Sequence, residues 1–146
     1  MNGPVAFERK KRALDKLFQT LSSRTVVVEG KKDEEALREL GVNGSVTLAQ
    51  GKSAVVVERV LRSCGGRNKG VVLLFDWDAA GEEKARLFEA LFRAEGASAA
   101  LDPSPRREFR HLLGCRFVEE SPARLSRILE EGEVKWERRT LTRSST

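Results

Sequence analysis

The stretch that most constrains this chain is VVLLFDWDAAG at positions 71–81, in which an unbroken apolar run ends in two acids. Such a run is typical of a strand that is buried on both faces, as in a parallel sheet covered by helices. In an extended chain, residues two positions apart point to the same side. Asp76 and Asp78 are therefore expected to direct their carboxylates into one small volume, with Trp77 facing the other way.

Two interpretations of this acidic pair follow from elementary electrostatics and helix capping. Like charges so close raise each other's pKa unless a cation lies between them. Mg²⁺ is a suitable cation, because it commonly binds one or two carboxylates together with water and substrate phosphates. Alternatively, Asp78 is the N-cap of a helix that begins at Ala79, and Asp76 is a solvated loop residue.

A second stretch repeats the pattern of apolar run, acid, glycine and helix. The β-branched run TVVV at positions 25–28 ends in Glu29 and Gly30, and a helical pattern follows. In open α/β sheets, ligands bind outside the carboxyl ends of the strands. The two stretches together predict one site with three carboxylates, contributed by Glu29, Asp76 and Asp78.

The two stretches VVVEGKKDEEALRELGV and VVLLFDWDAAGEEKA resemble the Toprim domain. This domain is shared by topoisomerases, bacterial-type primases, the 5S ribosomal RNA maturation nucleases and small stand-alone proteins. Its signature, a Glu-Gly after the first strand and an Asp-x-Asp-x-x-Gly after a later one, is matched by Glu29-Gly30 and by positions 76–81. The resemblance covers residues 25–101, with a weaker extension to residue 129, and it implies a Rossmann-like α/β fold.

The resemblance also implies a chemistry for the three acids. Asp76 and Asp78 would be ligands of Mg²⁺, with Mn²⁺ as a possible substitute, and Glu29 would be a metal ligand or a general acid/base. Such an ion neutralises a phosphoryl oxygen and lowers the pKa of a bound water, and a nearby carboxylate can move the proton. Glycines beside the site would let phosphate approach the backbone closely.

The basic residues are concentrated in the two flanks of the chain. The net charge is +5 overall, with +4 in residues 1–24, −1 in residues 25–101 and +2 in residues 132–146. This distribution favours a polyanion held by the flanks and presented to a metal held by the core. The alternative is that the basic residues serve solubility, and that the patch at positions 9–12 is a solvated helix face. The residues expected to contact phosphate or nucleic acid are Gly30, Lys31, Lys32, Lys52, Gly81, Arg9, Lys10, Lys11 and Arg12.

The alternation of strand and helix patterns predicts a four-stranded, mostly parallel sheet with helices on both faces. The strands are expected at 25–28, 46–48, 71–75 and 97–101, with a further short strand at 115–118. The helices are expected at 7–21, 32–40, 52–64, 79–95, 106–113 and from 121 through 128. These elements divide the chain into a basic N-terminal helix (1–24), a Toprim-like α/β domain (25–131) and a basic, flexible tail (132–146).

Composition narrows the class of protein further. Charged residues make up 34% of the chain while Cys and Met are scarce, a balance that favours a thermophilic source. No apolar run is long enough to span a membrane and no signal peptide is visible, so a cytoplasmic protein is expected. Cys64 and Cys115 lack a metal-ligand spacing and are expected to be reduced thiols.

Within the Toprim family, missing features separate the possible functions. The chain has no Tyr, which excludes a topoisomerase that uses a tyrosine nucleophile. The chain is too short and too poor in Cys and His for a primase with its zinc module, and no ATPase domain accompanies it. We therefore expect a Mg²⁺-dependent, endoribonuclease-like hydrolase that acts on structured RNA, with RNA favoured over DNA and RNA-processing proteins as possible partners. The alternatives are a non-catalytic nucleic-acid-binding module and a nucleotidyl transferase.

Overall fold

The chain folds as an α/β domain around a three-stranded parallel sheet with the strand order β2-β1-β3. The computed structural model describes residues 4–64 and 70–144, and the side chains of residues 5–64 and 70–133. The strands are β1 (Thr25–Val28), β2 (Ser45–Leu48) and β3 (Val71–Leu73). The helices within the described ranges are α1 (Pro4–Ser23), α2 (Lys31–Glu39), α3 (Ser53–Ser63), α4 (Ala79–Ala94), α5 (Ser104–Leu113) and α6 (Ser121–Ser144), with short 3-10 helices η1 (Ser98–Ala100) and η2 (Val118–Glu120).

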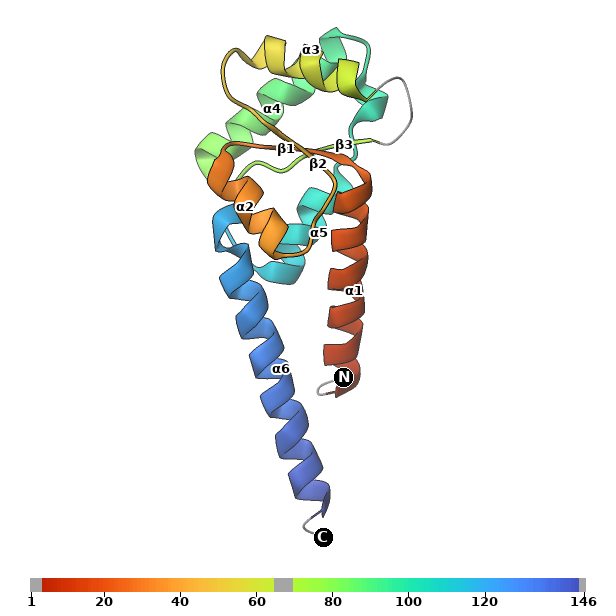
Figure 1. The fold of residues 1–146 in the computed structure, drawn as a ribbon, viewed down its shortest axis with the longest axis vertical. Coiled ribbons are helices and arrows are strands. Elements are labelled where there is room, and N and C mark those ends of the chain that lie inside the picture. Colours follow the sequence, from red (N-terminus) through yellow and green to blue (C-terminus); the bar gives the residue numbers. More distant parts are fainter. Residues whose placement is uncertain (1–3, 65–69, 145–146) are drawn as a thin grey trace.

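Helices cover both faces of the sheet, as the buried apolar strands predict (Figure 1). Every residue of β1 is buried, and its side chains alternate between the two faces. Val26 and Val28 pack with α1, α2 and α5, whereas Val27 packs with α3 and α4. The prediction of a parallel α/β fold with two covered faces is confirmed.

The strand order places a topological switch point between β1 and β3. The chain leaves β1 through α2 to reach β2 on one side, and then returns through α3 to β3 on the other side of β1. These two connections cover opposite faces of the sheet. In folds of this kind, ligands bind outside the carboxyl ends of the strands at the switch point, which here lies between β1 and β3. The residues that follow these two strands are therefore neighbours at the position where such folds bind ligands.

The prediction of a fourth strand at 97–101 is wrong. Residues 98–100 form η1, and the only sheet-like contact in this segment is a single parallel bridge between Leu101 and Val71. The segment ASAA at 97–100 has no β-branched or aromatic side chain to favour a strand. Pro103 then turns the chain into α5, whose start is fixed by a hydrogen bond from the Ser104 N–H to Asp102 Oδ1 (3.3 Å).

The predicted short strand at 115–118 is also absent. This segment lies against the end of β3 instead of joining a ladder along its length. The Trp77 N–H donates to the Arg116 carbonyl oxygen (2.9 Å), and the Val118 N–H donates to Asp76 Oδ1 (2.8 Å). The segment therefore holds the strand tip in place.

Helices α1 and α6 project from the sheet in the same direction, and α6 extends further than α1 (Figure 1). The predicted tail at 132–146 is mostly part of α6, which continues to Ser144. A Cβ atom at Gly132 would overlap the Phe7 ring of α1, so glycine permits the two helices to pack closely here. Among the described residues, no helix combines the length and apolar character that a membrane span requires.

Candidate functional site at the carboxyl ends of the strands

The first acid of the site, Asp76, is held at the tip of β3. Ladder pairing ends at Leu73, but the Leu74 N–H still donates to the Val27 carbonyl oxygen (2.8 Å), which keeps the tip beside β1. Asp76 is half-buried, and its Oδ1 accepts the Val118 N–H. One carboxylate oxygen is thus fixed by the backbone, and no backbone N–H in the described chain donates to the other.

Asp78 is the N-cap of α4. Its backbone is extended (φ −86°, ψ 177°), and its Oδ1 accepts the Gly81 N–H (2.8 Å). The capping interpretation of the sequence is therefore correct for this residue. Capping uses only one of the two carboxylate oxygens of Asp78, so the other oxygen is still available to a cation. Helix capping and metal binding by Asp78 therefore do not exclude each other.

Glu29, which directly follows β1, meets Asp76 across the switch point. The two carboxyl groups are close enough for each to act on the pKa of the other. Burial raises the pKa of Glu29, the negative charge of Asp76 raises it further, and the ammonium group of Lys84 opposes this rise. Burial is also the main reason that the pKa of Asp76 is raised, with smaller contributions from Asp78 and Glu119.

Two further acids, Asp33 and Glu119, lie near Asp76 and were not expected from the sequence. Asp33 lies at the start of α2, is only 8% exposed, and accepts the Gly30 N–H at Oδ2 (3.2 Å). Burial raises the pKa of Asp33, and the charge of Asp76 raises it further. An acid three residues after a helix N-cap is a known capping signal, and it could have drawn attention to Asp33. Glu119 comes from η2, and no local pattern connects it to β3.

Asp76 and Asp78 fit a Mg²⁺ ion that completes its coordination shell with water and phosphate oxygens. In the described ranges, no three His, Cys, Asp or Glu side chains are placed to hold a metal ion as a group. Mg²⁺ does not require such a cage, because one or two carboxylates are its usual protein ligands. Asp76 and Asp78 each use one oxygen for a backbone N–H, and a cation beside the second oxygens would relieve the repulsion between them.

Arg106 of α5 anchors the strand tip from the side opposite β1. Its guanidinium donates to the carbonyl oxygens of Phe75 (3.1 Å) and Asp76 (2.9 Å), and to Glu82 Oε1 (2.9 Å). It also lies over the Trp77 ring, 5.3 Å from the centroid. The sequence pattern predicts that Arg106 lies on a helix but indicates no function for it, because its partner Phe75 lies 31 residues away along the chain.

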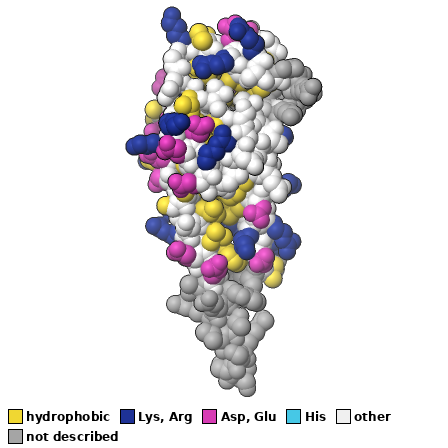
Figure 2. Space-filling view, viewed as in Figure 1, with side chains coloured by type: hydrophobic (Ala, Val, Ile, Leu, Met, Phe, Trp, Pro, Cys, Tyr) yellow, Lys and Arg dark blue, Asp and Glu magenta, His cyan; other side chains and the backbone are white. Residues whose placement is uncertain are grey.

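The lysines expected to meet phosphate are exposed around this edge of the sheet. Lys31 and Lys32 occupy the first turn of α2, with Lys31 Nζ 3.9 Å from Glu34 Oε1, and Lys52 immediately precedes α3. Over α2, acidic and basic side chains are intermixed (Figure 2). Lys84 was missed by sequence analysis: its Nζ donates to the Ala49 carbonyl oxygen (3.2 Å), and its charge acts on Glu29.

The two glycines of the motifs have different surroundings. Around Gly30, a Cβ atom would meet nothing within 4 Å, so the backbone beside Glu29 is open to a ligand. At Gly81, a Cβ atom would overlap the backbone of Asp76. Gly81 is therefore explained by close packing of α4 against the strand tip, and that side of it is closed to phosphate.

The basic patch at Arg9, Lys10, Lys11 and Arg12 is not part of this site. It lies on the first half of α1, near the end marked N in Figure 1, whereas the strands end beside the start of α2. A cavity of about 640 Å³ lies beside the patch, and its lining includes Phe7 and Glu133. Hydrophobic side chains are visible on the surface in this part of the molecule (Figure 2).

The fold and the site together define a class: an α/β domain with a cluster of acids at the switch point of a parallel sheet. The chain is 31% identical to a UPF0292 protein of Methanocaldococcus jannaschii, covering 62% of this chain and 69% of that protein. It is 30% identical to a UPF0292 protein of Thermococcus onnurineus, covering 73% and 74%. The chain belongs to the UPF0292 family.

The chain was also compared with protein-family models and with solved structures. No protein-family model matches the chain. A solved structure of an Aquifex aeolicus protein superposes with a TM-score of 0.59 at 25% sequence identity, covering 75% of this chain and 95% of that one. The arrangement of strands and helices is therefore shared with a protein from a bacterium.

Proposed function

We propose that this protein is a Toprim-like enzyme that cleaves phosphodiester bonds in structured RNA with the help of Mg²⁺. The observation that carries the proposal is the meeting of Glu29 with Asp76 at the carboxyl ends of β1 and β3, with Asp78 two residues further on. Both acidic motifs of the Toprim signature thus lie at one switch point, where α/β folds bind their ligands.

The surroundings of each acid would give it a different role in the reaction. Asp76 and Asp78, each with one oxygen held by a backbone N–H, would hold the ion in a fixed place. When bound, Mg²⁺ would neutralise charge on the phosphoryl group and lower the pKa of a water molecule. Glu29 would move the proton, because its raised pKa lies closer to neutral pH than that of an ordinary glutamate.

The surroundings of the acids suit a polyanionic substrate. Gly30 leaves the backbone beside Glu29 open, and Lys31, Lys32 and Lys52 are exposed at the same edge. These positive charges would offset the repulsion between substrate phosphates and the acids. Structured RNA is favoured by the resemblance to the ribosomal RNA maturation nucleases.

A non-catalytic RNA-binding module is the second candidate. It is favoured by the use of one oxygen of Asp76 and one of Asp78 in backbone hydrogen bonds, which gives both residues a structural task. In that case the acids would stabilise the strand tip and the lysines would contact RNA without chemistry.

The test is cleavage of labelled ribosomal RNA precursors by the purified protein in Mg²⁺ and in EDTA. We expect cleavage only with Mg²⁺, and a loss of at least about 100-fold in Asp76→Asn, Asp78→Asn and Glu29→Gln. Asn keeps the oxygen that accepts the backbone N–H, so the tip and the helix start should be preserved. Asp15→Asn, an exposed acid on α1, is the matched control and should cleave normally.

The outcomes separate the two candidates. Cleavage that continues in EDTA and in all three variants would contradict the metal-site proposal. RNA binding by the wild-type protein without any cleavage in Mg²⁺ or Mn²⁺ would favour the binding module.

A further inference from the structure

The outer edge of β3 contains a gap one residue long. In a parallel ladder, alternate residues direct their N–H and C=O groups to opposite neighbours. The Thr25 N–H donates to the Gly70 carbonyl oxygen (3.2 Å) and the Leu74 N–H to the Val27 carbonyl oxygen (2.8 Å). With Val27 paired to Leu73 in this register, the N–H and C=O of Leu73 point away from β1.

The carbonyl oxygens of Val71 and Phe75, on either side of Leu73, accept hydrogen bonds, whereas the N–H and C=O of Leu73 have no such partner among the described residues. The Val71 carbonyl oxygen accepts the Asp102 N–H (2.9 Å), and the Phe75 carbonyl oxygen accepts Arg106 Nε (3.1 Å). No residue that the structure describes donates to the Leu73 carbonyl oxygen or accepts from its N–H. Leu73 is 7% exposed, and buried backbone groups are almost always paired. A ligand is therefore a natural partner for this donor and acceptor.

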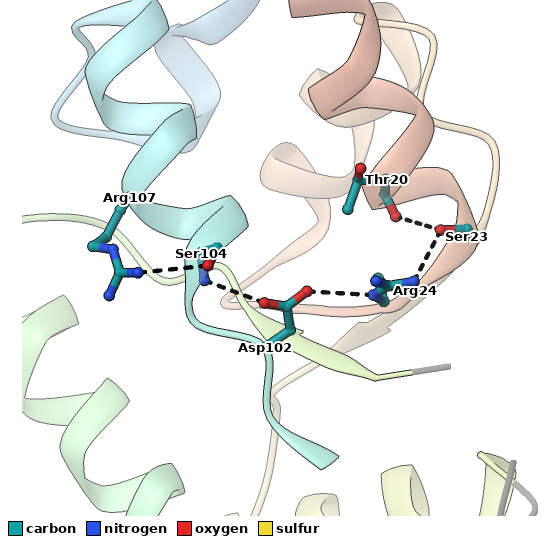
Figure 3. Close-up of polar contacts among 6 residues, drawn as sticks. All are labelled: Thr20, Ser23, Arg24, Asp102, Ser104 and Arg107. Carbon is teal, nitrogen blue, oxygen red and sulfur yellow. Dashed lines mark hydrogen bonds and ion pairs between the residues drawn. The ribbon is translucent and has the colours of Figure 1, made fainter. Parts of the chain in front are cut away.

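A network of side chains explains why the chain does not fill the gap (Figure 3). Asp102 Oδ2 accepts from Arg24 Nε (3.4 Å), and Asp102 Oδ1 accepts the Ser104 N–H (3.3 Å). These contacts turn the chain away from β3 and into α5 directly after the bridge at Leu101. Because both ends of the gap are closed, a polypeptide strand cannot add to this edge.

The gap borders a cavity of about 250 Å³, which is lined by both apolar and charged side chains. This volume is below that of pockets for drug-sized molecules, so the cavity suits a small group. Arg107 lines this cavity and is exposed, and its guanidinium donates a hydrogen bond to Ser104 Oγ (3.5 Å). The apolar lining residues are Val71, Leu73, Ala85, Leu101 and Pro103, and the charged ones are Glu89, Asp102, Arg106 and Arg107.

We propose that this cavity binds a nucleobase, with Arg107 contacting the attached phosphate. Base edges present adjacent hydrogen-bond donors and acceptors, which match the N–H and C=O of Leu73. Apolar walls accept the faces of a base, and an arginine suits a phosphate.

The base would lie close to the acidic site, because Arg106 lines the cavity and also donates to the Asp76 carbonyl oxygen (2.9 Å). Only this role of the cavity, holding a nucleotide of the substrate beside the metal, rests on the proposed function. Binding itself does not depend on it.

The test is a titration of the full chain with AMP in EDTA, followed by NMR of the backbone amides and by equilibrium dialysis. We expect the Leu73 amide resonance to shift on AMP binding. Ala85→Leu, which fills the cavity, should weaken binding by at least about tenfold, and Arg107→Ala by about tenfold through loss of the phosphate contact. Arg110→Ala, an exposed arginine on the same helix, is the matched control and should bind within a factor of about two of the wild type.

Four results would overturn the proposal. These are an unshifted Leu73 amide in the wild type, undiminished binding by a folded Ala85→Leu protein, a response to inorganic phosphate but not to adenosine, and displacement of AMP by a short peptide amide. Should Ala85→Leu fail to fold, the Leu73 resonance of the wild type still decides the question. If the protein does not cleave RNA, it should still bind AMP. If it does not bind AMP, Mg²⁺-dependent cleavage should still be observed.

Discussion

At the scale of single residues, the negative charges of the acidic site lower the stability of the folded, metal-free protein. Burial, reinforced by the charges of neighbouring acids, raises the pKa values of Glu29, Asp33 and Asp76. A group whose pKa is higher in the folded state contributes stability below its unfolded pKa, and this stability is lost as the pH rises through the folded value. Neutral pH is therefore less favourable for the metal-free protein than mildly acidic pH, as far as these three groups are concerned.

We expect Glu29→Gln to stabilise the protein at pH 7 in EDTA. The substitution removes a charge that burial and Asp76 disfavour, and the melting temperature should rise by roughly 2 °C. The gain should shrink as the pH falls toward 4.5, the ordinary pKa of a glutamate, because a growing fraction of the wild-type side chain is then protonated. Thermal melts from pH 4 to 8 measure this, with the exposed Glu39→Gln as control. A variant less stable than the wild type at pH 7 would contradict the prediction.

At the scale of elements, the site depends on how closely α4 approaches the tip of β3. Gly81 lies in the first turn of α4, and the backbone of Asp76 occupies the space that a side chain would need. Arg106 holds the same tip from α5, and the Val118 N–H holds it from the start of η2. Three elements thus fix the position of one carboxylate, which is the degree of control that a metal ligand requires.

Gly81→Ala should destabilise the protein by about 3 kcal/mol or more, because the added methyl group meets backbone that cannot move aside easily. In an exposed helix the same change would be stabilising by about 1 kcal/mol. Gly30→Ala is the matched control: its added methyl group meets nothing within 4 Å, so the fold should be retained. Urea unfolding of both variants measures the difference. Equal stability of Gly81→Ala and wild type would show that α4 does not pack as described.

At the scale of the whole molecule, the acidic site and the basic patch lie at different ends. The first half of α1 lies far from the carboxyl ends of the strands (Figure 1). A nucleic acid that touched both would have to extend along the molecule. The patch is therefore expected to add affinity without taking part in the chemistry.

Replacing Arg9, Lys10, Lys11 and Arg12 with Gln should weaken RNA binding and reduce the slope of log K against log salt by up to about 3. Cleavage at saturating RNA should be unchanged, because the acids are untouched. Filter binding at several salt concentrations measures the slope. Neutralising four exposed arginines of α3 and α4 (Arg59, Arg62, Arg86 and Arg93) removes the same charge and is the control. An unchanged affinity and slope would show that the patch is a solvated helix face.

The parallel α/β architecture, the three core strands and the position of Glu29, Asp76 and Asp78 at strand ends could all be predicted from the amino-acid sequence. These features are local: a buried strand appears as an apolar run, and the residue after it must lie at the carboxyl edge of the sheet. The N-cap role of Asp78 is local in the same way, because its partner Gly81 lies three residues further along the chain.

The other residues of the site are brought there by long-range packing, which the sequence does not reveal. Asp76 is held by the Val118 N–H, 42 residues away, and its carbonyl oxygen by Arg106, 30 residues away. The absence of a fourth strand also depends on a long-range contact. Asp102 pairs with Arg24, 78 residues away along the chain, and this contact turns the chain away from β3. Such contacts leave no periodic signal in the sequence, because they depend on how separate elements pack and not on the pattern within any one of them.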